Sequence, residues 1–427
     1  MKFYSTADNN LKVSFERAVI EGLAPSRGLY FPESIHQHSK SFLNDLSKMT
    51  LPEIGYEVMK PYTEGDIDNS SLASIVEETL NFPIPLKEID DHLFTLELFH
   101  GPTMAFKDVG ARFMSRCLSH FNKEKVKILV ATSGDTGGAV ANGFYKVEGV
   151  EVIILYPGNK ISDIQEQQLT TLGENITALE VNGTFDDCQN LVKEAFLDNE
   201  LKSKMNLSSA NSINIARWMP QSIYYYWIKA QLGTTNRPLS ISVPSGNFGN
   251  ISAGVLAQKS GLEIDQFIAA TNANDIVPQY IKTGIYDPKP SVSTIANAMD
   301  VGDPSNHLRM LELFDHDHEK FINNINGYSL CDSEIKEVIK DVHHTFDYIL
   351  DPHGAIAYNA SKELGNQEQD RVFLETAHPV KFRDVVEPII GKKLNVPARL
   401  ETCLNKEKVA INMSTNYDDF KSFLLKH

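Results

Sequence analysis

The chain has 427 residues, and its 40 Lys and Arg against 56 Asp and Glu give a formal net charge of −16. Hydrophobic residues make up 42% and charged residues 22%, which argues against a disordered chain or a coiled coil and for a globular protein of two or three domain-sized units. The acidic balance argues against nucleic acid or an anionic membrane surface as the partner.

No apolar run approaches the roughly 18 residues that span a bilayer, and residues 1–10 lack the pattern of a signal peptide. The four cysteines are widely spaced and form no CxxC pair, which argues against a disulfide scaffold and a Cys-rich zinc site. We therefore expect a cytoplasmic protein that binds neither nucleic acid nor membrane.

The pattern of apolar and polar residues changes along the chain. Residues 1–95 are predicted to form short helices and turns, with an amphipathic helix over 71–80. From about residue 125, apolar runs of strand length alternate with helical patterns, which predicts an α/β fold with a largely parallel sheet covered on both faces. The predicted strands are 127–133, 152–156, 176–181, 239–243, 267–271 and 372–376, and the predicted helices of this part are 163–172, 185–197, 213–231 and 332–350.

One lysine stands out in the segment 100–108, which reads HGPTMAFKD. Its Gly-Pro pair indicates a turn and a helical pattern follows, so Lys107 is predicted to lie where a loop meets a helix. Apolar surroundings near a helix N-terminus disfavour the ammonium form of a lysine and make it a better amine nucleophile. The alternative is a surface lysine paired with Asp108.

Two glycine-rich loops each follow a predicted strand and open a helix: 132–138 (TSGDTGG) and 245–250 (SGNFGN). Backbone N–H groups at a helix N-terminus hold phosphate or carboxylate, and two such loops suit a ligand that carries both. The first loop lacks G-x-G-x-x-G spacing and neither loop has a P-loop lysine, so NAD and ATP are weak candidates. The alternative for either loop is an ordinary connection between a strand and a helix.

A third junction, 211–217 (NSINIAR), opens the long predicted helix. Ser212 is predicted to cap this helix, and Arg217 is predicted to lie about one turn further on. N–H groups, a hydroxyl and a guanidinium together suit a phosphate. A helix cap beside a surface arginine is the other interpretation.

The acidic and histidine-rich run 315–319 (DHDHE) suggests a metal site at first sight. Adjacent ligands on a solvated loop rarely close such a site, so we predict no metal. His343 and His344 are neighbours in a predicted helix, where they face different directions.

Together these segments resemble the threonine synthase family, pyridoxal-phosphate enzymes of fold type II, the tryptophan-synthase-β-like group. The resemblance covers nearly the whole chain, and the matching blocks follow the family's order. The blocks are 13–15 (VSF) with 18–19 and 22–23, 100–103 (HGPT), 106–108 (FKD), 131–137 (ATSGDTG), 211–214 (NSIN) with Arg217, 243–249 (VPSGNFG), 297–301 (NAMDV) and 376–379 (TAHP). Related fold-II dehydratases and sulfhydrylases usually carry asparagine where this chain has Asp135.

The resemblance implies pyridoxal 5'-phosphate as the cofactor, with Lys107 as the lysine that binds it in a Schiff base. Asp135 is expected to contact the cofactor's phenolic oxygen, and Thr376 is expected to face its pyridine nitrogen. The residues expected around the cofactor phosphate are Gly246, Asn247, Phe248, Gly249 and Asn250.

The resemblance also implies a small-molecule substrate, O-phospho-L-homoserine, which reacts with water to give L-threonine and phosphate, the last step of threonine biosynthesis. Ser133 and Thr136 match the loop for the substrate carboxylate. The residues that match the substrate-phosphate site are Asn211, Ser212 and Arg217. Lys107 is expected to carry most of the proton transfers.

The architecture implied is two open parallel-sheet α/β lobes with the cofactor in the cleft, as a monomer or homodimer. We expect an N-terminal helical region over 1–95, a catalytic region over 96–390 whose smaller lobe spans about 125–215, and a tail over 391–427. Two alternatives stay open: another fold-II reaction, such as Ser/Thr dehydration or β-replacement, and a non-catalytic protein that binds a phosphoamino acid.

Overall fold

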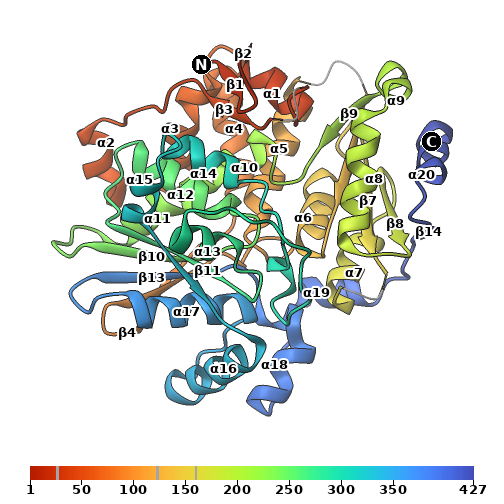
Figure 1. Cartoon of the computed structure of the whole chain (residues 1–427). Helices are drawn as coiled ribbons and strands as arrows, with labels where there is room; N and C mark the ends of the chain where they lie inside the picture. The colour runs from red at the N-terminus through yellow and green to blue at the C-terminus, as the bar shows by residue number, and fades with distance from the viewer. Residues whose placement is uncertain (26–27, 122–124, 159–160) are drawn as a thin grey trace.

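The computed structural model describes residues 1–25, 28–121, 125–158 and 161–427. Two mainly parallel sheets form two lobes, and the N-terminal residues form a small antiparallel sheet, drawn at the top of Figure 1. The α/β fold class predicted from the sequence is confirmed.

The larger lobe is built on a six-stranded sheet in which only β4 is antiparallel. In spatial order its strands are β12 (Ile325–Ser329), β11 (Gln266–Thr271), β10 (Leu239–Pro244), β13 (Asp370–Glu375), β5 (Leu93–Glu97) and β4 (Leu86–Asp90). The two central strands β10 and β13 are buried at every residue, because helices cover both faces. In Figure 1, α17 (Pro352–Leu364) lies on one side of this sheet, and α12 (Gly249–Lys259) and α13 (Ile276–Thr283) lie on the other.

The remaining helices of the larger lobe surround this sheet. They are α5 (Lys107–Phe121), α10 (Ile215–Trp218), η2 (Met219–Ser222), α11 (Ile223–Leu232), η3 (Asn297–Met299), α14 (His307–Leu313), α15 (His318–Asn324), α16 (Asp332–Phe346), η4 (Pro379–Phe382) and α18 (Arg383–Ile390).

The smaller lobe contains a five-stranded sheet in which all strands are parallel. In spatial order its strands are β14 (Ile411–Met413), β8 (Ile176–Val181), β7 (Val150–Pro157), β6 (Val126–Ala131) and β9 (Asn206–Ser209). Side chains of β7 alternate between two hydrophobic clusters: Val152 joins the cluster that includes α6 (Asp135–Phe144), whereas Ile153 joins the one that includes α8 (Phe185–Leu197). Successive side chains of a strand point to opposite faces, so α6 and α8 cover opposite faces of this sheet.

The N-terminal region contains strands as well as helices, which the sequence prediction missed. β1 (Phe3–Ser5) pairs antiparallel with both β2 (Asp8–Val13) and β3 (Tyr30–Pro32). The helices there are α1 (Phe15–Glu21), α2 (Lys40–Asp45), η1 (Leu46–Lys48), α3 (Leu51–Thr63) and α4 (Asn69–Thr79). β4 and the first three residues of β5 also lie within 1–95, although both strands belong to the larger sheet.

The segment 391–427, predicted as a mixed tail, has a definite structure on the smaller lobe. β14 pairs with β8 at the edge of the sheet, and α19 (Ala398–Leu404) packs against α7 (Asp163–Thr170). α20 (Tyr417–Lys426) packs against α8 and α9 (Asn199–Lys204), and its Phe420 and Leu424 are buried in the cluster beneath α8. This segment therefore completes the smaller lobe, as Figure 1 shows on the right.

The long helix predicted over 213–231 is divided into three pieces, α10, η2 and α11. Pro220 lies in the first turn of the middle, 3₁₀ segment. Proline has no N–H to donate, so a continuous helix is broken at this point.

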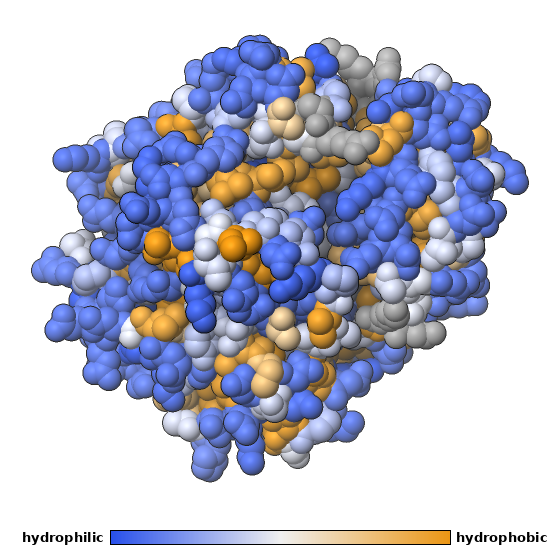
Figure 2. All heavy atoms as spheres, viewed as in Figure 1, coloured by the Kyte–Doolittle hydropathy of each residue, from blue (hydrophilic) through white to orange (hydrophobic). Residues whose placement is uncertain are grey.

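The face of the molecule in Figure 2 is mainly hydrophilic, with apolar side chains in small separate patches, as the charge of −16 leads one to expect. In the part of the chain that the structure describes, no helix combines the length and the apolar character needed to traverse a bilayer.

Candidate active site

A pocket lined by residues from both lobes brings the sequence-predicted site residues together. Its lining includes every one of them: Lys107, Ser133, Asp135, Thr136, Asn211, Ser212, Arg217, Gly246, Asn247, Phe248, Gly249, Asn250 and Thr376. The pocket lies where β6, β10 and β13 end and helices begin, which is where ligands bind in parallel α/β sheets. The roles of the individual residues remain predictions.

Lys107 is the first residue of α5, and the loop before it is fixed to the end of β13. The Phe106 N–H donates to the Thr376 carbonyl at 2.9 Å, and the His378 N–H donates to the Met104 carbonyl at 3.1 Å. Lys107 is half-buried as a residue and lines the pocket. Burial, together with the nearby cations, lowers the pKa of Lys107 to about 8 despite the opposing effect of Asp135. The result is an amine that loses its proton near neutral pH.

Asp135 is the first residue of α6, and it forms a buried ion pair that the sequence did not reveal. The Lys381 Nζ lies 2.6 Å from the Asp135 Oδ1, and the two side chains are 0% and 3% exposed. Burial alone would raise the pKa of Asp135, but Lys381 and Lys107 hold it well below its ordinary value. The preceding residue, Gly134, has φ 127°, a conformation that favours glycine.

The second glycine loop forms the N-terminus of α12, an 11-residue helix whose N-cap Phe248 is left-handed at φ 58°. A Cβ on Gly246 would lie 2.6 Å from the Met299 Cα, so only glycine fits there. The Asn250 Oδ1 accepts a hydrogen bond from the Tyr225 hydroxyl at 2.8 Å, whereas its buried Nδ2 donor has no partner in the part of the chain that the structure describes. The first N–H groups of a helix also lack internal partners. This loop is therefore rich in donors that an anion would satisfy.

Ser212 lies beside this loop, but it does not cap the following helix as predicted. The cap of α10 is Asn214, whose side chain accepts from the Ala216 N–H at 3.0 Å. Ser212 lies two residues earlier, and its hydroxyl accepts from Asn247 Nδ2 at 2.7 Å and from Asn306 Nδ2 at 3.3 Å. The contact joins the junction at 211–217 to the glycine loop at 245–250.

Arg217 is a buried cation that lines the pocket and is only 2% exposed. Its Nη1 donates to the Ala210 carbonyl, while its Nε finds no partner among the described residues. A Cβ on Gly110 would lie 3.2 Å from that Nε, so glycine there lets α5 approach closely. Among the residues described, no carboxylate comes within ion-pair distance of Arg217. Burial lowers the pKa of Arg217 to about 10, so it stays charged at neutral pH and suits an anionic ligand.

His353 is a pocket residue that the sequence analysis missed. Its Nδ1 is hydrogen-bonded to Asp351, and its Nε2 accepts the Ala298 N–H at 3.2 Å. Burial and Asp351 raise the pKa of the adjacent Glu375 well above its ordinary value. Asp351 caps α17 and is followed by proline, so an Asp-Pro-His signal for a helix start was present in the sequence.

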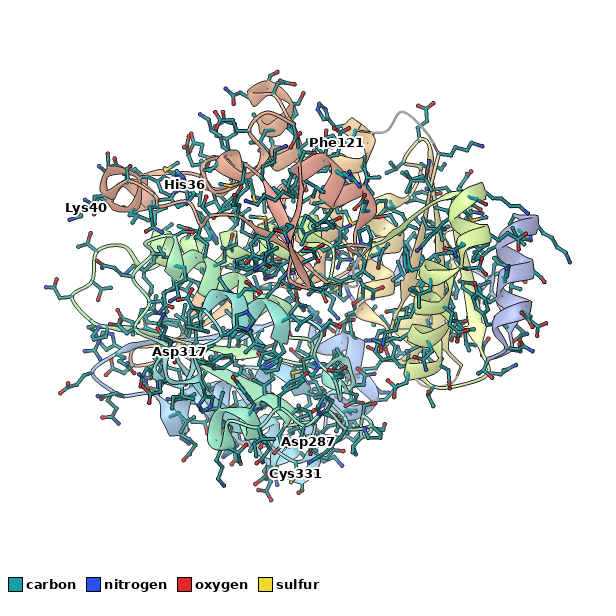
Figure 3. The ribbon with its side chains drawn as sticks, turned by 45° about the horizontal axis from the view of Figure 1, so that its top comes forward. His36, Lys40, Phe121, Asp287, Asp317 and Cys331 are labelled. Atoms are coloured by element: carbon teal, nitrogen blue, oxygen red, sulfur yellow. The ribbon has the colours of Figure 1, made fainter. Side chains whose placement is uncertain are left out.

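The side chains of the run 315–319 make structural contacts with neighbouring residues. The Asp317 side chain caps α15, and Lys320 Nζ pairs with Asp315 at 2.6 Å. The His318 Nε2 lies 3.0 Å from the Tyr280 carbonyl. Figure 3 shows Asp317 on the larger lobe, away from the smaller lobe. Over the described ranges of the chain, no group of His, Cys, Asp and Glu side chains is arranged to hold a metal ion.

The residues present fit pyridoxal phosphate. Lys107, whose pKa is lowered to about 8, can serve as the amine that binds the cofactor. It shares the pocket with the Asn250 Nδ2, which has no partner among the described residues, and with the N-terminal N–H groups of α12, and these donors suit a phosphate. Residues 81–374 match the family described as "Pyridoxal-phosphate dependent enzyme". The fold and the site thus define a pyridoxal-phosphate-dependent enzyme of fold type II.

Three comparisons narrow this class. Residues 2–80 match the family described as "Threonine synthase N terminus", and residues 354–424 match "Threonine synthase, C-terminal". Threonine synthase of Haemophilus influenzae is 42% identical over 428 residues, with 100% of both chains covered. The crystal structure of threonine synthase from Escherichia coli is 39% identical, with a TM-score of 0.95 and full coverage of both chains. The PLP-bound threonine synthase of Brucella melitensis is 33% identical, with a TM-score of 0.93, covering 100% of this chain and 99% of its own. The chain belongs to the threonine synthase family.

Proposed function

We propose that this pocket converts O-phospho-L-homoserine and water to L-threonine and phosphate. The observation that carries this proposal is the presence of two separate groups of anion-binding donors beside Lys107. One is the N-terminus of α12 with the Asn250 Nδ2, and the other is the buried cation Arg217; among the described residues, this Nδ2 has no hydrogen-bond partner and Arg217 has no carboxylate partner. The cofactor carries one phosphate and the substrate carries a second, so each of the two sets of donors would bind one phosphate.

Bound pyridoxal phosphate supplies an electron sink that makes the protons at the substrate's Cα and Cβ acidic. Lys107 would hold the cofactor covalently and, once released, would take the proton from Cα, take the proton from Cβ as phosphate leaves Cγ, and return protons at Cγ and Cα. Its lowered pKa supports this role, since an amine that titrates near neutral pH can both accept and donate a proton.

The substrate is held at both ends. We assign the carboxylate to the N-terminus of α6, with Ser133 and Thr136, because both residues line the pocket where this helix begins and a helix N-terminus attracts negative charge. We assign the phosphate to Asn211, Ser212 and Arg217. The Asn211 Nδ2 donates to the Ala131 carbonyl at 2.8 Å, which ties this junction to the end of β6.

Arg217 has a second task when the C–O bond at Cγ breaks and phosphate leaves. Charge then builds up on the departing phosphate, and a guanidinium already in place stabilises it without reorganisation. Water adds at Cβ afterwards, so a phosphate retained by Arg217 also lies within the pocket as a base for that water.

Thr376 and the loop 246–250 are assigned to the cofactor's pyridine nitrogen and phosphate, and Asp135 to its phenolic oxygen. We further propose a cytoplasmic enzyme, a monomer or homodimer, with an N-terminal region over 1–95, a catalytic region over 96–390 and a C-terminal segment over 391–427.

A product assay tests the function. Purified enzyme with pyridoxal phosphate is given O-phospho-L-homoserine, and threonine and phosphate are measured together. Equal amounts of both products are expected. Faster 2-oxobutyrate release from threonine than threonine formation would favour the dehydratase alternative, and tight binding of the phosphoamino acid without turnover would favour a binding protein.

A further inference from the structure

Lys381 is a completely buried lysine that does not line the pocket, although its partner Asp135 does. It lies in η4, just after β13, and its Nζ contacts Asp135 Oδ1 at 2.6 Å and the Thr103 carbonyl at 3.0 Å. Two fully buried opposite charges are costly to desolvate, and they persist only where further hydrogen bonds satisfy them.

Such hydrogen bonds are present around the pair. The Gln165 Nε2 donates to the same Asp135 Oδ1 at 3.0 Å. The Gln168 Nε2 donates to the Thr103 carbonyl at 3.0 Å, next to Lys381. Both glutamines lie on α7, so the pair joins α6 and α7 of the smaller lobe to the loop that carries Lys107.

Lys107 is the other lysine close to Asp135. Its charge environment consists of Asp135, which favours the ammonium form, and of Lys381 and Arg217, which oppose it. Lys381 also faces Asp108, a buried carboxylate hydrogen-bonded to the Thr103 N–H at 2.9 Å. If Lys381 were absent, Asp135 would be a buried carboxylate whose remaining cation is Lys107.

We propose that Lys381 is a positioning residue that occupies Asp135 as its counter-ion, so that Lys107 is not captured in an ion pair and stays available as an amine. A lysine paired with a buried carboxylate holds its proton and is a poor nucleophile. The chain thus uses two lysines for one carboxylate: one neutralises it and the other reacts. The inference rests on the proposed role of Lys107 as the cofactor-binding amine.

The test measures the pKa of Lys107 in the cofactor-free, full-length protein by competitive acetylation at a series of pH values, with the Lys107 peptide quantified by mass spectrometry. Lys381→Met should raise this pKa by about one unit or more, because a neighbouring opposite charge shifts a pKa by roughly 1–3 units. Asp135→Asn should lower it, since Lys381 and Arg217 would then act unopposed. The double variant should return close to the wild-type value, because a neutral pair has been removed.

Controls keep the result interpretable. Lys393→Met removes a lysine whose side chain is 93% exposed, and it should leave the Lys107 pKa unchanged. Lys381→Gln is a second neutral variant that keeps a donor for the Thr103 carbonyl, for use if methionine prevents folding. In the holoenzyme, the pH midpoint of the visible absorption should move in the same direction as the Lys107 pKa in each variant.

An unchanged or lowered Lys107 pKa in both neutral Lys381 variants would overturn the inference, as would a double variant that behaves like Lys381→Met alone. The Lys107 pKa, whether measured in the Lys381 variants or in the double variant, does not depend on which reaction the enzyme catalyses. Failure to make threonine would overturn the proposed function while leaving this test intact.

Discussion

Replacing Arg217 with methionine removes the guanidinium but keeps a long, unbranched side chain in the same buried position. Arg217 is buried without a carboxylate partner in the described chain, and one of its donors, Nε, is unpaired. Removing a lone buried cation should not weaken the fold, so we expect the free energy of unfolding to change by less than about 1 kcal/mol.

The effect on a phosphorylated substrate should be large. Removing one member of a buried charged pair from a ligand site costs roughly 2–5 kcal/mol. Because Nη1 already donates to the Ala210 carbonyl, fewer donors remain for the phosphate, and we expect a loss of about 3 kcal/mol. That corresponds to about a 100-fold decrease in kcat/KM for O-phospho-L-homoserine, at ~1.4 kcal/mol per factor of ten.

The assay compares this decrease with the slow reactions of serine or threonine, which carry no phosphate and should lose less than about threefold, a difference of ~0.6 kcal/mol. Arg116→Met serves as the control, because Arg116 lies on α5 outside the pocket, where its Nε pairs with the Glu78 carboxylate at 3.2 Å. Equal losses on both kinds of substrate would refute the reasoning and would make Arg217 a structural residue.

Three further predictions follow from the packing and charges. Lys107→Ala should lose the covalent cofactor bond and essentially all turnover, and borohydride reduction of the wild type should label Lys107; a label on a different lysine would contradict the assignment. Glu375→Gln should remove a pH dependence of stability. Burial and Asp351 raise the Glu375 pKa in the folded protein, so its stabilisation is complete below the unfolded pKa of about 4.3 and is lost as pH rises above it, by ~1.4 kcal/mol per pH unit. Denaturant titrations at pH 5 and 8 should therefore show the variant gaining stability relative to wild type at the higher pH; equal differences at both would mean that Glu375 is ionised when folded. Phe420→Ala should cost about 3–5 kcal/mol, because Phe420 is 0% exposed in the core of the smaller lobe; a change below about 1 kcal/mol in denaturant unfolding would mean that α20 contributes little.

The fold was predictable where local pattern and tertiary structure agree. Segments of strand length that are rich in apolar residues, such as 176–181 (ITALEV) and 239–243 (LSISV), became β8 and β10 with almost the same bounds. β14 was missed because it has three residues, of which only Met413 is buried. Its strand character depends on pairing with β8, far away in the sequence, and no local pattern records such a pairing.

The sequence predicted those site residues whose signal lies in the residues next to them. The glycine loops and the lysine after HGPTMAF carry their own signals, and all of them reach one pocket. Lys381 carries none, because a lysine is ordinarily solvated and its burial depends on Asp135, which is distant in sequence. The error at Ser212 has a similar origin: its hydroxyl contacts Asn247 and Asn306 across the site, while Asn214 takes over the cap.

The pairing of β14 with β8 also bears on how the protein is synthesised. Ribosomes extend a chain from its N-terminus, so β6, β7 and β8 emerge long before residues 411–424 are available. During that interval the edge of β8 is unpaired and the apolar surface that receives Phe420 and Leu424 is uncovered. An exposed edge of this kind is a template for association with other chains. The nascent smaller lobe therefore exposes this edge and this apolar surface until residues 411–424 have been translated.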